Sequence, residues 1–233
     1  MSLVRGSRTI ASGLSRRPDS ADCNRARCTI VTKAKNIGAY VQDEVQLEDN
    51  LNITYGQPIS LNPSRLGFVR VLQRMGAEIE IEVTHEQVEP VGRLKLRHLD
   101  LRGPLKGVRV EAAEVPSLID ELPLLAVLAT QSEGITEVFG AQELRVKETD
   151  RIEAIASNLR LMGGKIETRP DGFTIQGPQK LRGAAIQSFH DHRIAMAFSI
   201  AALIAEGDSL IENADCVAVS YPDFFSILKS LIS

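Results

Sequence analysis

The chain has 233 residues, and 27 Lys and Arg residues against 30 Asp and Glu residues give it a formal net charge of −3. Hydrophobic residues make up 43% of the sequence and charged residues 24%, which is ordinary for a globular protein and excludes a disordered or collagen-like chain. The charge balance does not favour nucleic-acid binding, and no apolar run reaches the roughly 18–20 residues that a membrane span needs.

Residues 1–60 show little periodicity, so we treat them as a separate N-terminal segment. Its first part, Met1–Lys33, is rich in Arg and Ser but lacks the apolar core of a secretory signal. This composition is compatible with an organelle transit peptide, although a disordered leader or a non-native N-terminus is the favoured interpretation. Two short apolar pieces, Cys28–Val31 and Leu51–Ile53, are candidate strands.

The three cysteines and four histidines show neither disulfide nor metal-ligand spacing. An odd number of cysteines without paired spacing argues against a disulfide framework and against a zinc site. A reducing compartment fits best, so we expect a cytoplasmic protein, or a plastid protein if the source is a plant or an alga.

Regular periodicity begins at Leu61, and from there helical and alternating patterns follow one another. In 79–83, Ile and Val alternate with Glu, which predicts a half-buried strand. Glycines at 76 and 163–164 are expected to stop the helices before them. The patterns predict helices at 68–75, 122–131, 152–162, 194–205 and 223–231, and strands at 79–83, 94–98, 108–110, 165–168 and 173–176.

Two internal matches indicate a repeated structural unit. Val71–Glu80 reads VLQRMGAEIE, and Asn158–Glu167, 87 residues later, reads NLRLMGGKIE. Leu124–Asp150 matches Ala197–Asp223 at an offset of 73 residues. The match includes a Glu-Gly pair after each apolar helix, at 133–134 and 206–207. Any two α/β segments look somewhat alike, but agreement in the helix stop, the turn and the next helix favours a true repeat. Such units are expected to pack around a shared core.

The repeat places charged residues at the starts of helices. Asp120 and Arg193 are equivalent at the offset of 73, and each lies close to the start of an apolar helix. Helix N-termini attract anions through their free N–H groups and the helix dipole. If the repeated helices point to one place, that place is expected to bind anionic substrates. Asp120 can alternatively act only as an N-cap.

Two charged runs precede the next helices: RVKETDR at 145–151 and HDHR at 190–193. Taken singly, each run is typical of a solvated face, and Thr149 or Asp150 suffices as an N-cap. Taken together with Asp120, they predict a cleft for phosphate and carboxylate groups, in which Arg binds as a two-pronged donor.

Three of these segments resemble the signatures of a known family. LRVKETDRI at Leu144–Ile152, DHRIAMA at Asp191–Ala197 and IDELP at Ile119–Pro123 are similar to motifs of the 5-enolpyruvylshikimate-3-phosphate (EPSP) synthase family. The resemblance runs from about Leu61 to Ser233, which divides the chain into residues 1–60 and an enolpyruvyl transferase-like domain at 61–233. It implies an α/β (α+β) fold in which repeated βαβαββ units form an inside-out α/β barrel, here incomplete.

The resemblance implies a 3-phosphoshikimate 1-carboxyvinyltransferase. Members transfer the enolpyruvyl group of phosphoenolpyruvate to the 5-hydroxyl of shikimate 3-phosphate and release phosphate. This is the shikimate-pathway step towards chorismate and the aromatic amino acids that glyphosate blocks. The resemblance implies no metal and no organic cofactor.

Residue roles follow from the same resemblance. Asp120 matches the aspartate that takes the proton of the substrate hydroxyl and holds shikimate 3-phosphate. Lys147 matches the lysine that contacts both substrates, and Glu148 the glutamate that protonates the methylene carbon of phosphoenolpyruvate; Lys147 remains an alternative donor. Arg151 and Arg193 match the arginines that bind the carboxylate and phosphate of phosphoenolpyruvate. The remaining substrate-binding residues that we expect are Glu143 and His192.

The sequence leaves alternatives to an active transferase. The N-terminal family signature, which supplies a lysine and a serine, has no clear match here, so the isolated chain is expected to turn over little. A catalytically inactive remnant, or a half-domain that needs a missing N-terminal domain as partner, is the first alternative. A UDP-N-acetylglucosamine enolpyruvyl transferase is less favoured, because Cys216 does not lie in that family's nucleophilic cysteine loop.

Overall fold

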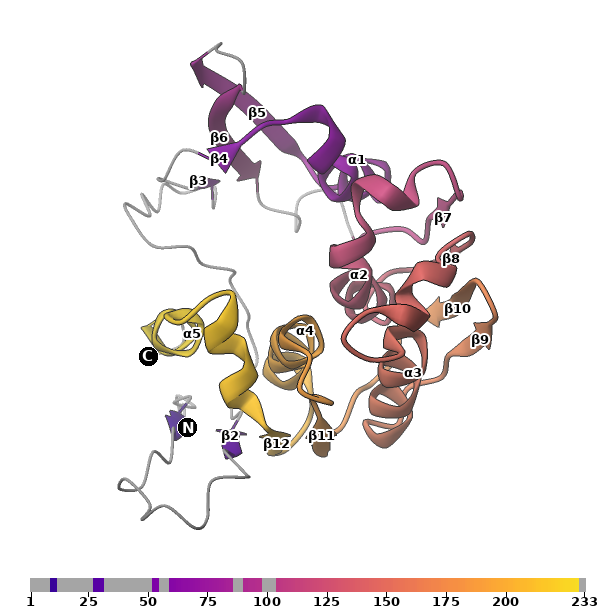
Figure 1. Cartoon of the computed structure of the whole chain (residues 1–233), viewed down its shortest axis with the longest axis vertical. Helices are drawn as coiled ribbons and strands as arrows, with labels where there is room; N and C mark the ends of the chain where they lie inside the picture. The colour runs from indigo at the N-terminus through magenta and orange to yellow at the C-terminus, as the bar shows by residue number, and fades with distance from the viewer. Residues whose placement is uncertain are drawn as a thin grey trace, which may run out of the picture. The chain divides into compact units, whose positions relative to one another are not determined.

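The computed structural model describes residues 9–11, 27–31, 52–54, 59–85, 90–97 and 104–230 (Figure 1). Its chain divides into two compact units that alternate along the sequence. We call Met1–Gly38, Glu143–Ile166 and Gln179–Ser233 the terminal unit, and Ala39–Gln142 and Glu167–Pro178 the central unit. Within the described ranges, no helix has the length and apolar character required to cross a membrane.

The central unit contains two sheets, with helices between the strands in sequence. Its helices are α1 (Gly67–Arg74) and α2 (Leu122–Ala129), preceded by the 3-10 turns η1 (Pro63–Arg65), η3 (Val115–Ser117) and η4 (Ile119–Glu121). Its strands are β3 (Asn52–Thr54), β4 (Ile59–Ser60), β5 (Ile79–His85), β6 (Val91–Arg97), β7 (Arg109–Val110), β8 (Gly134–Val138), β9 (Glu167–Arg169) and β10 (Gly172–Gly177).

The terminal unit contains one sheet and the three remaining α-helices. Its strands are β1 (Thr9–Ala11), β2 (Arg27–Val31), β11 (Ala185–Gln187) and β12 (Ser209–Glu212). Its helices are α3 (Arg151–Leu161), α4 (His192–Ile204) and α5 (Phe224–Ser230), with the 3-10 turn η6 (Ala214–Val219) after β12. Another 3-10 turn, η5 (Gln142–Val146), links the two units in sequence.

These elements confirm the predicted helices and strands within the described residues. Both candidate strands of the N-terminal segment are present, as β2 and β3. Several predicted features lie outside the described residues: His98 at the end of β6, Leu231 at the end of α5, and most of the proposed leader at 1–33. The proposed separation of 1–60 from 61–233 stays a prediction.

Two sheets share one strand plan. In the central unit the order is β7-β8-β10-β9, with β8 parallel to β7 and antiparallel to β10. In the terminal unit the order is β11-β12-β2-β1, again with one parallel pair followed by two antiparallel pairs. The sequence repeat therefore corresponds to a repeated sheet, in which β12 takes the place of β8.

The backbone reproduces the repeat at its turns. Gly134 and Gly207, which are 73 residues apart, both have left-handed φ angles of 96° and 92°. Gly76 and Gly163, which are 87 residues apart, have φ angles of 102° and 80°, where glycine avoids the steric cost of a side chain. The predicted helix stops are confirmed.

Long-range backbone hydrogen bonds repeat as well. The N–H of Lys106 donates to the Met75 carbonyl at 2.8 Å, and the N–H of Arg182 donates to the Met162 carbonyl at 2.8 Å. In each bond, the carbonyl belongs to the residue after a helix, α1 or α3, and the N–H to a residue that precedes a strand, β7 or β11. The repeat is thus a repeat of contacts and not only of element order.

The core is aliphatic, as a sequence with few aromatic residues requires. Helix α2, LPLLAVLA, buries six of its residues, and α4 buries eight. The prediction for β5 is wrong in one respect: Ile79 is half-buried, but Ile81 and Val83 are 37% and 48% exposed. The strand forms, but its apolar side chains are largely exposed at these two positions.

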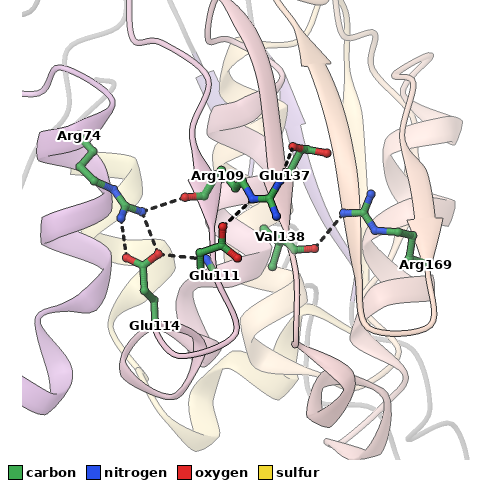
Figure 2. Close-up of polar contacts among 7 residues, drawn as sticks. All are labelled: Arg74, Arg109, Glu111, Glu114, Glu137, Val138 and Arg169. Carbon is green, nitrogen blue, oxygen red and sulfur yellow. Dashed lines mark hydrogen bonds and ion pairs between the residues drawn. The ribbon is translucent and has the colours of Figure 1, made fainter.

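A polar network ties α1 to β7, at the edge of the β7-β8-β10-β9 sheet (Figure 2). The Arg74 guanidinium donates to Glu114 at 2.6 and 3.3 Å and to the Arg109 carbonyl at 3.1 Å. Burial alone would raise the pKa of Glu114, but hydrogen bonds from the Glu111 N–H and from Arg74, together with the charge of Arg74, hold it below its ordinary value.

Two arginines flank one aromatic ring in the same region. The guanidinium carbons of Arg109 and Arg169 lie 4.4 and 4.2 Å from the centroid of the Phe139 ring. Arg169 also donates to the Val138 carbonyl at 3.2 Å, as Figure 2 shows, and Arg109 pairs with Glu111 at 2.6 Å. These contacts hold the end of β8 against its neighbours.

Candidate active site

The charged run before α3 is organised by its last aspartate. Asp150 is the N-cap of α3, where its carboxylate accepts the Glu153 N–H at 3.1 Å and an Arg145 guanidinium N–H at 2.6 Å. Of the two candidate caps in the sequence, Asp150 is therefore the one used, and Thr149 is not. The run folds back on itself because this carboxylate satisfies both a helix amide and a neighbouring cation.

A second aspartate organises the start of α4. Asp191 is the N-cap of α4 and accepts the N–H groups of Arg193 and Ile194 at 2.8 and 3.3 Å. Its side chain is fully buried, and it also accepts from Arg151 Nε at 2.7 Å and Arg151 Nη2 at 3.4 Å. One carboxylate therefore joins the starts of two helices.

Arg151 is held between two carboxylates. Its side chain is 2% exposed, and Nη2 donates to Glu148 at 2.7 Å in addition to the contacts with Asp191. A buried guanidinium needs such partners, because an unpaired charge away from water is strongly destabilising. Glu148 is the outer member of the series Asp191–Arg151–Glu148, and its side chain is 47% exposed. Its carboxylate can therefore reach a molecule in solution while it is bound to Arg151.

The other predicted residues of the terminal unit lie close to these helix starts in sequence. His192 and Arg193 are the first two residues of α4 and are half-buried, whereas Lys147 and Glu143 are exposed, in or directly after η5. The structure thus brings Glu148 and Arg151 into direct contact.

Asp120 belongs to the central unit. It lies in η4, directly ahead of α2, is 24% exposed and has Arg65 at 3.9 Å. Glu121, the residue after Asp120, is at the cap position of α2, and its side chain makes no capping hydrogen bond; the N-cap role of Asp120 stays a prediction. An aspartate in the first turn still interacts favourably with the helix dipole.

The helix amides themselves are less available to anions than the sequence suggested. At α4 the first amides bind Asp191, and at α3 the Glu153 amide binds Asp150. The protein's own carboxylates thus occupy the positions at which a substrate anion was expected. The Lys and Arg side chains around these caps are then the candidates for contacts with anions.

Sequence reasoning missed the role of Asp191 and the turn before it. Phe189 and His190 have left-handed φ angles of 55° and 59°, which are rare for residues other than glycine. Ser188 fixes this turn: its hydroxyl accepts the His190 N–H at 3.2 Å, and its carbonyl accepts the Asp191 N–H at 3.0 Å. An aspartate directly ahead of an apolar helix was the available signal for Asp191; the strained turn has no evident signature.

Cys216 is not activated as a nucleophile. Burial raises the pKa of its thiol, a hydrogen bond with Ser188 opposes the shift, and the charges of Asp215 and Asp191 raise the pKa further. The thiol therefore stays protonated near neutral pH, unlike an activated cysteine.

The fold and these charged helix starts define a mixed α/β protein built of repeated strand and helix units. The model of the family "EPSP synthase (3-phosphoshikimate 1-carboxyvinyltransferase)" matches residues 50–228. The chain belongs to the EPSP synthase family, which confirms the resemblance seen in its sequence motifs.

Curated relatives are similar over only part of their length. The chain is 49% identical over 178 residues to the 3-phosphoshikimate 1-carboxyvinyltransferase of Alkaliphilus oremlandii, covering 75% of this chain and 40% of the relative. It is 48% identical over 173 residues to that of Aquifex aeolicus, covering 73% and 39%. The chain thus spans about two fifths of the length of the curated relatives that it matches.

Solved structures agree with the fold. An EPSP synthase from Acinetobacter baumannii superposes with a TM-score of 0.70 at 35% identity, covering 78% of this chain and 41% of that one. The enolpyruvyl transferase NikO from Streptomyces tendae, at 22% identity and a TM-score of 0.57, supports the fold alone. The predicted α/β class is confirmed.

Proposed function

We propose that this chain is part of a 3-phosphoshikimate 1-carboxyvinyltransferase, which transfers the enolpyruvyl group of phosphoenolpyruvate to shikimate 3-phosphate and releases phosphate. The single observation that carries the proposal is the buried Arg151–Asp191 pair, with Glu148 on its outer side. It fixes the family's two charged motifs in one arrangement, with an exposed carboxylate next to a cation.

The residue roles follow the family pattern. Arg151 and Arg193 bind the anionic groups of phosphoenolpyruvate, with Glu143 and His192 among the substrate contacts. Glu148 donates a proton to the methylene carbon, with Lys147 as the alternative donor, and Asp120 accepts the proton of the attacking hydroxyl. Protonation of the methylene carbon creates an oxocarbenium-like centre, which neighbouring carboxylates stabilise until the hydroxyl attacks.

The same proposal extends to the architecture. Residues 61–233 form an enolpyruvyl transferase-like domain of repeated βαβαββ units that belong to an inside-out α/β barrel. The shared plan of the β7-β8-β10-β9 and β11-β12-β2-β1 sheets supports the repeat. Because the chain spans less than half of its relatives, it needs the rest of the family fold to enclose both substrates.

A phosphate-release assay tests the activity. The purified 233-residue chain, given phosphoenolpyruvate and shikimate 3-phosphate, is expected to release very little phosphate. A chimera in which residues 50–228 replace the matching part of the Alkaliphilus oremlandii relative is expected to turn over, and to need both substrates. A folded but inactive chimera would instead identify this chain as an inactive remnant. Turnover with UDP-N-acetylglucosamine as acceptor would favour the sister activity.

Substitution of Glu148 tests the proposed proton donor in that chimera. Glu148→Gln removes the transferable proton and is expected to lower kcat by about 10²–10⁴-fold. Glu153→Gln is the matched control, because Glu153 lies one turn further along and pairs with Arg160 at 3.6 Å; its turnover is expected to stay close to that of the parent. Equal effects of the two substitutions would contradict the assignment.

A further inference from the structure

The segment 146–149, which carries Lys147 and Glu148, has little of the support that fixes most of the fold. It lies between the 3-10 turn η5 and helix α3. Residues 146–148 are all exposed, Val146 to 81%, so burial contributes little here. In the part of the chain that the structure describes, no hydrogen bond between backbone groups begins or ends at residues 147–149. The course of this segment therefore depends on side-chain contacts.

The Arg145 side chain closes the segment into a ring. Its Nη1 atom donates to the Asp150 carboxylate at 2.6 Å, across five positions of the chain. Asp150 is itself fixed, because its other carboxylate oxygen accepts the Glu153 N–H at 3.1 Å as the cap of α3. On the other side, Leu144 directly before Arg145 is fully buried. The ion pair therefore joins a point anchored in the core to the first turn of a helix.

Inside this ring, Glu148 makes a second contact. Arg151 Nη2 donates to the Glu148 carboxylate at 2.7 Å. Arg151 is a fixed point, because it is buried and its Nε atom is 2.7 Å from the Asp191 carboxylate. Lys147 lies between the Arg145–Asp150 pair and this contact in sequence. Two contacts between arginine and carboxylate thus stand where backbone hydrogen bonds and burial are lacking.

The Arg145–Asp150 pair is suited to set positions and contributes little to stability. The two side chains are 32% and 37% exposed, and ion pairs that face water stabilise a fold only slightly. A planar guanidinium nevertheless fixes the direction of a carboxylate that it binds. A displacement of about 1 Å at a reacting group can lower turnover by about 10²-fold. Loss of this pair is therefore expected to affect turnover far more than stability.

We propose that Arg145 is a positioning residue of the transferase, which acts through Asp150 to hold segment 146–149 so that Lys147 and Glu148 face the substrates. The proposal rests on the proposed function, which assigns Lys147 and Glu148 to the reaction, and it adds a residue that the proposed function does not use. A residue that binds substrate directly would act without Asp150, whereas a positioning residue acts only through it.

A double-mutant cycle in the chimera separates these two roles. Arg145→Gln is expected to lower kcat, calculated per folded molecule, by about 10–100-fold. Asp150→Asn keeps an N-cap but removes the charge, and a similar loss is expected. Because both substitutions break the same pair, the double variant is expected to lose no more than either single variant. Losses that multiply would show that Arg145 acts without Asp150 and would overturn the proposal.

A conservative variant and a matched control make the cycle specific. Arg145→Lys keeps a cation that can pair with Asp150, so its kcat is expected to be clearly higher than that of Arg145→Gln. Arg160→Gln breaks the 3.6 Å pair between Arg160 and Glu153, another exposed pair of α3, and is expected to leave kcat unchanged. No recovery in Arg145→Lys, or equal kcat for Arg145→Gln and Arg160→Gln, would contradict the proposal.

Limited proteolysis tests the same contact without substrates. Endoproteinase Lys-C cleaves after lysine, so cleavage after Lys147 measures how often the segment opens in the native 233-residue chain. Arg145→Gln and Asp150→Asn are each expected to speed this cleavage about two- to fivefold. Cleavage after the exposed Lys165, in the same sample, should keep its rate.

The proteolysis result stands apart from the activity. Unchanged cleavage after Lys147 in both variants would show that the pair does not hold the segment, and would overturn the proposal. An inactive parent chimera would count against the proposed function alone, and the cleavage rates would still decide whether Arg145 holds residues 146–149 in place.

Discussion

Arg151 is one of the largest side chains that this structure buries fully. A guanidinium is costly to remove from water, so its position depends on the carboxylates beside it. Asp191 serves it on one side while capping α4 on the other. A single carboxylate thus couples the position of a proposed substrate-binding residue to the start of a helix.

Asp191→Asn tests this coupling, because asparagine keeps the helix cap but removes the charge. Leaving the buried guanidinium with only the partly exposed Glu148 is expected to cost about 3–5 kcal/mol of unfolding free energy. Urea denaturation measures the loss. Arg145→Gln is the control, since it breaks the Arg145–Asp150 pair, which is about one third exposed, and is expected to cost less than about 1 kcal/mol. Equal losses of unfolding free energy for Asp191→Asn and Arg145→Gln would mean that burial of the Arg151–Asp191 pair does not increase the cost of breaking it.

Glu114 provides a pH-dependent prediction. Its pKa is lower in the folded protein than in the unfolded chain, so its contribution to stability is complete above the ordinary pKa of glutamate. The contribution disappears as the pH falls through the folded-state pKa. The urea midpoints of the native protein and of Glu114→Gln should therefore differ most near neutral pH and converge on acidification. A difference that stays constant with pH would contradict the assignment.

At the scale of elements, the helix stops are the most exact part of the repeat. A methyl group at Gly76 or Gly163 meets nothing within 4 Å, so substitution changes only the cost of the left-handed backbone. Gly76→Ala and Gly163→Ala are each expected to lower the unfolding free energy by about 1 kcal/mol, by similar amounts, in urea titrations.

Gly140→Ala extends this comparison. Gly140 also has a positive φ, of 71°, but its added Cβ would lie 2.2 Å from the Cβ of Ala112. This substitution is expected to cost clearly more than the other two, because steric overlap adds to the backbone strain. A cost equal to that of Gly163→Ala would show that the loop at Ala112 adapts freely.

The sequence predicted elements better than it predicted their surroundings. Periodicity is a local property, so α2, α3 and α4 were found with nearly correct bounds. Burial of β5 depends on what lies over it, and the alternation of Ile and Glu cannot report that. Likewise, the motifs identified Arg151, but its pairing with Asp191 joins residues 40 positions apart and is visible only in the folded chain.

At the scale of the whole molecule, each unit draws on distant parts of the chain. The sheet of the terminal unit joins β2, near one end of the sequence, to β12, near the other, with Ile211 opposite Cys28. Residues 1–33, for which the sequence favoured a disordered leader or a non-native N-terminus, thus contribute two strands, β1 and β2, in the described residues.

Removal of residues 1–38 tests the importance of these strands. Without β2, one edge of β12 loses its partner, so the amides of 209–212 are expected to exchange faster. Those of β8, whose partners are retained, should exchange as before. Hydrogen exchange with mass spectrometry makes the comparison within one sample. Unchanged exchange at β12 would show that β2 does not stabilise this sheet.

The pairing of β2 with β12 also orders events during synthesis. β2 (Arg27–Val31) is translated long before its partner β12 (Ser209–Glu212). The β7-β8-β10-β9 sheet, by contrast, needs only residues 109–177 and can form before β12 has been translated. Contacts between such distant positions form slowly, so closure of the terminal sheet is expected to be a late step in reaching the native state.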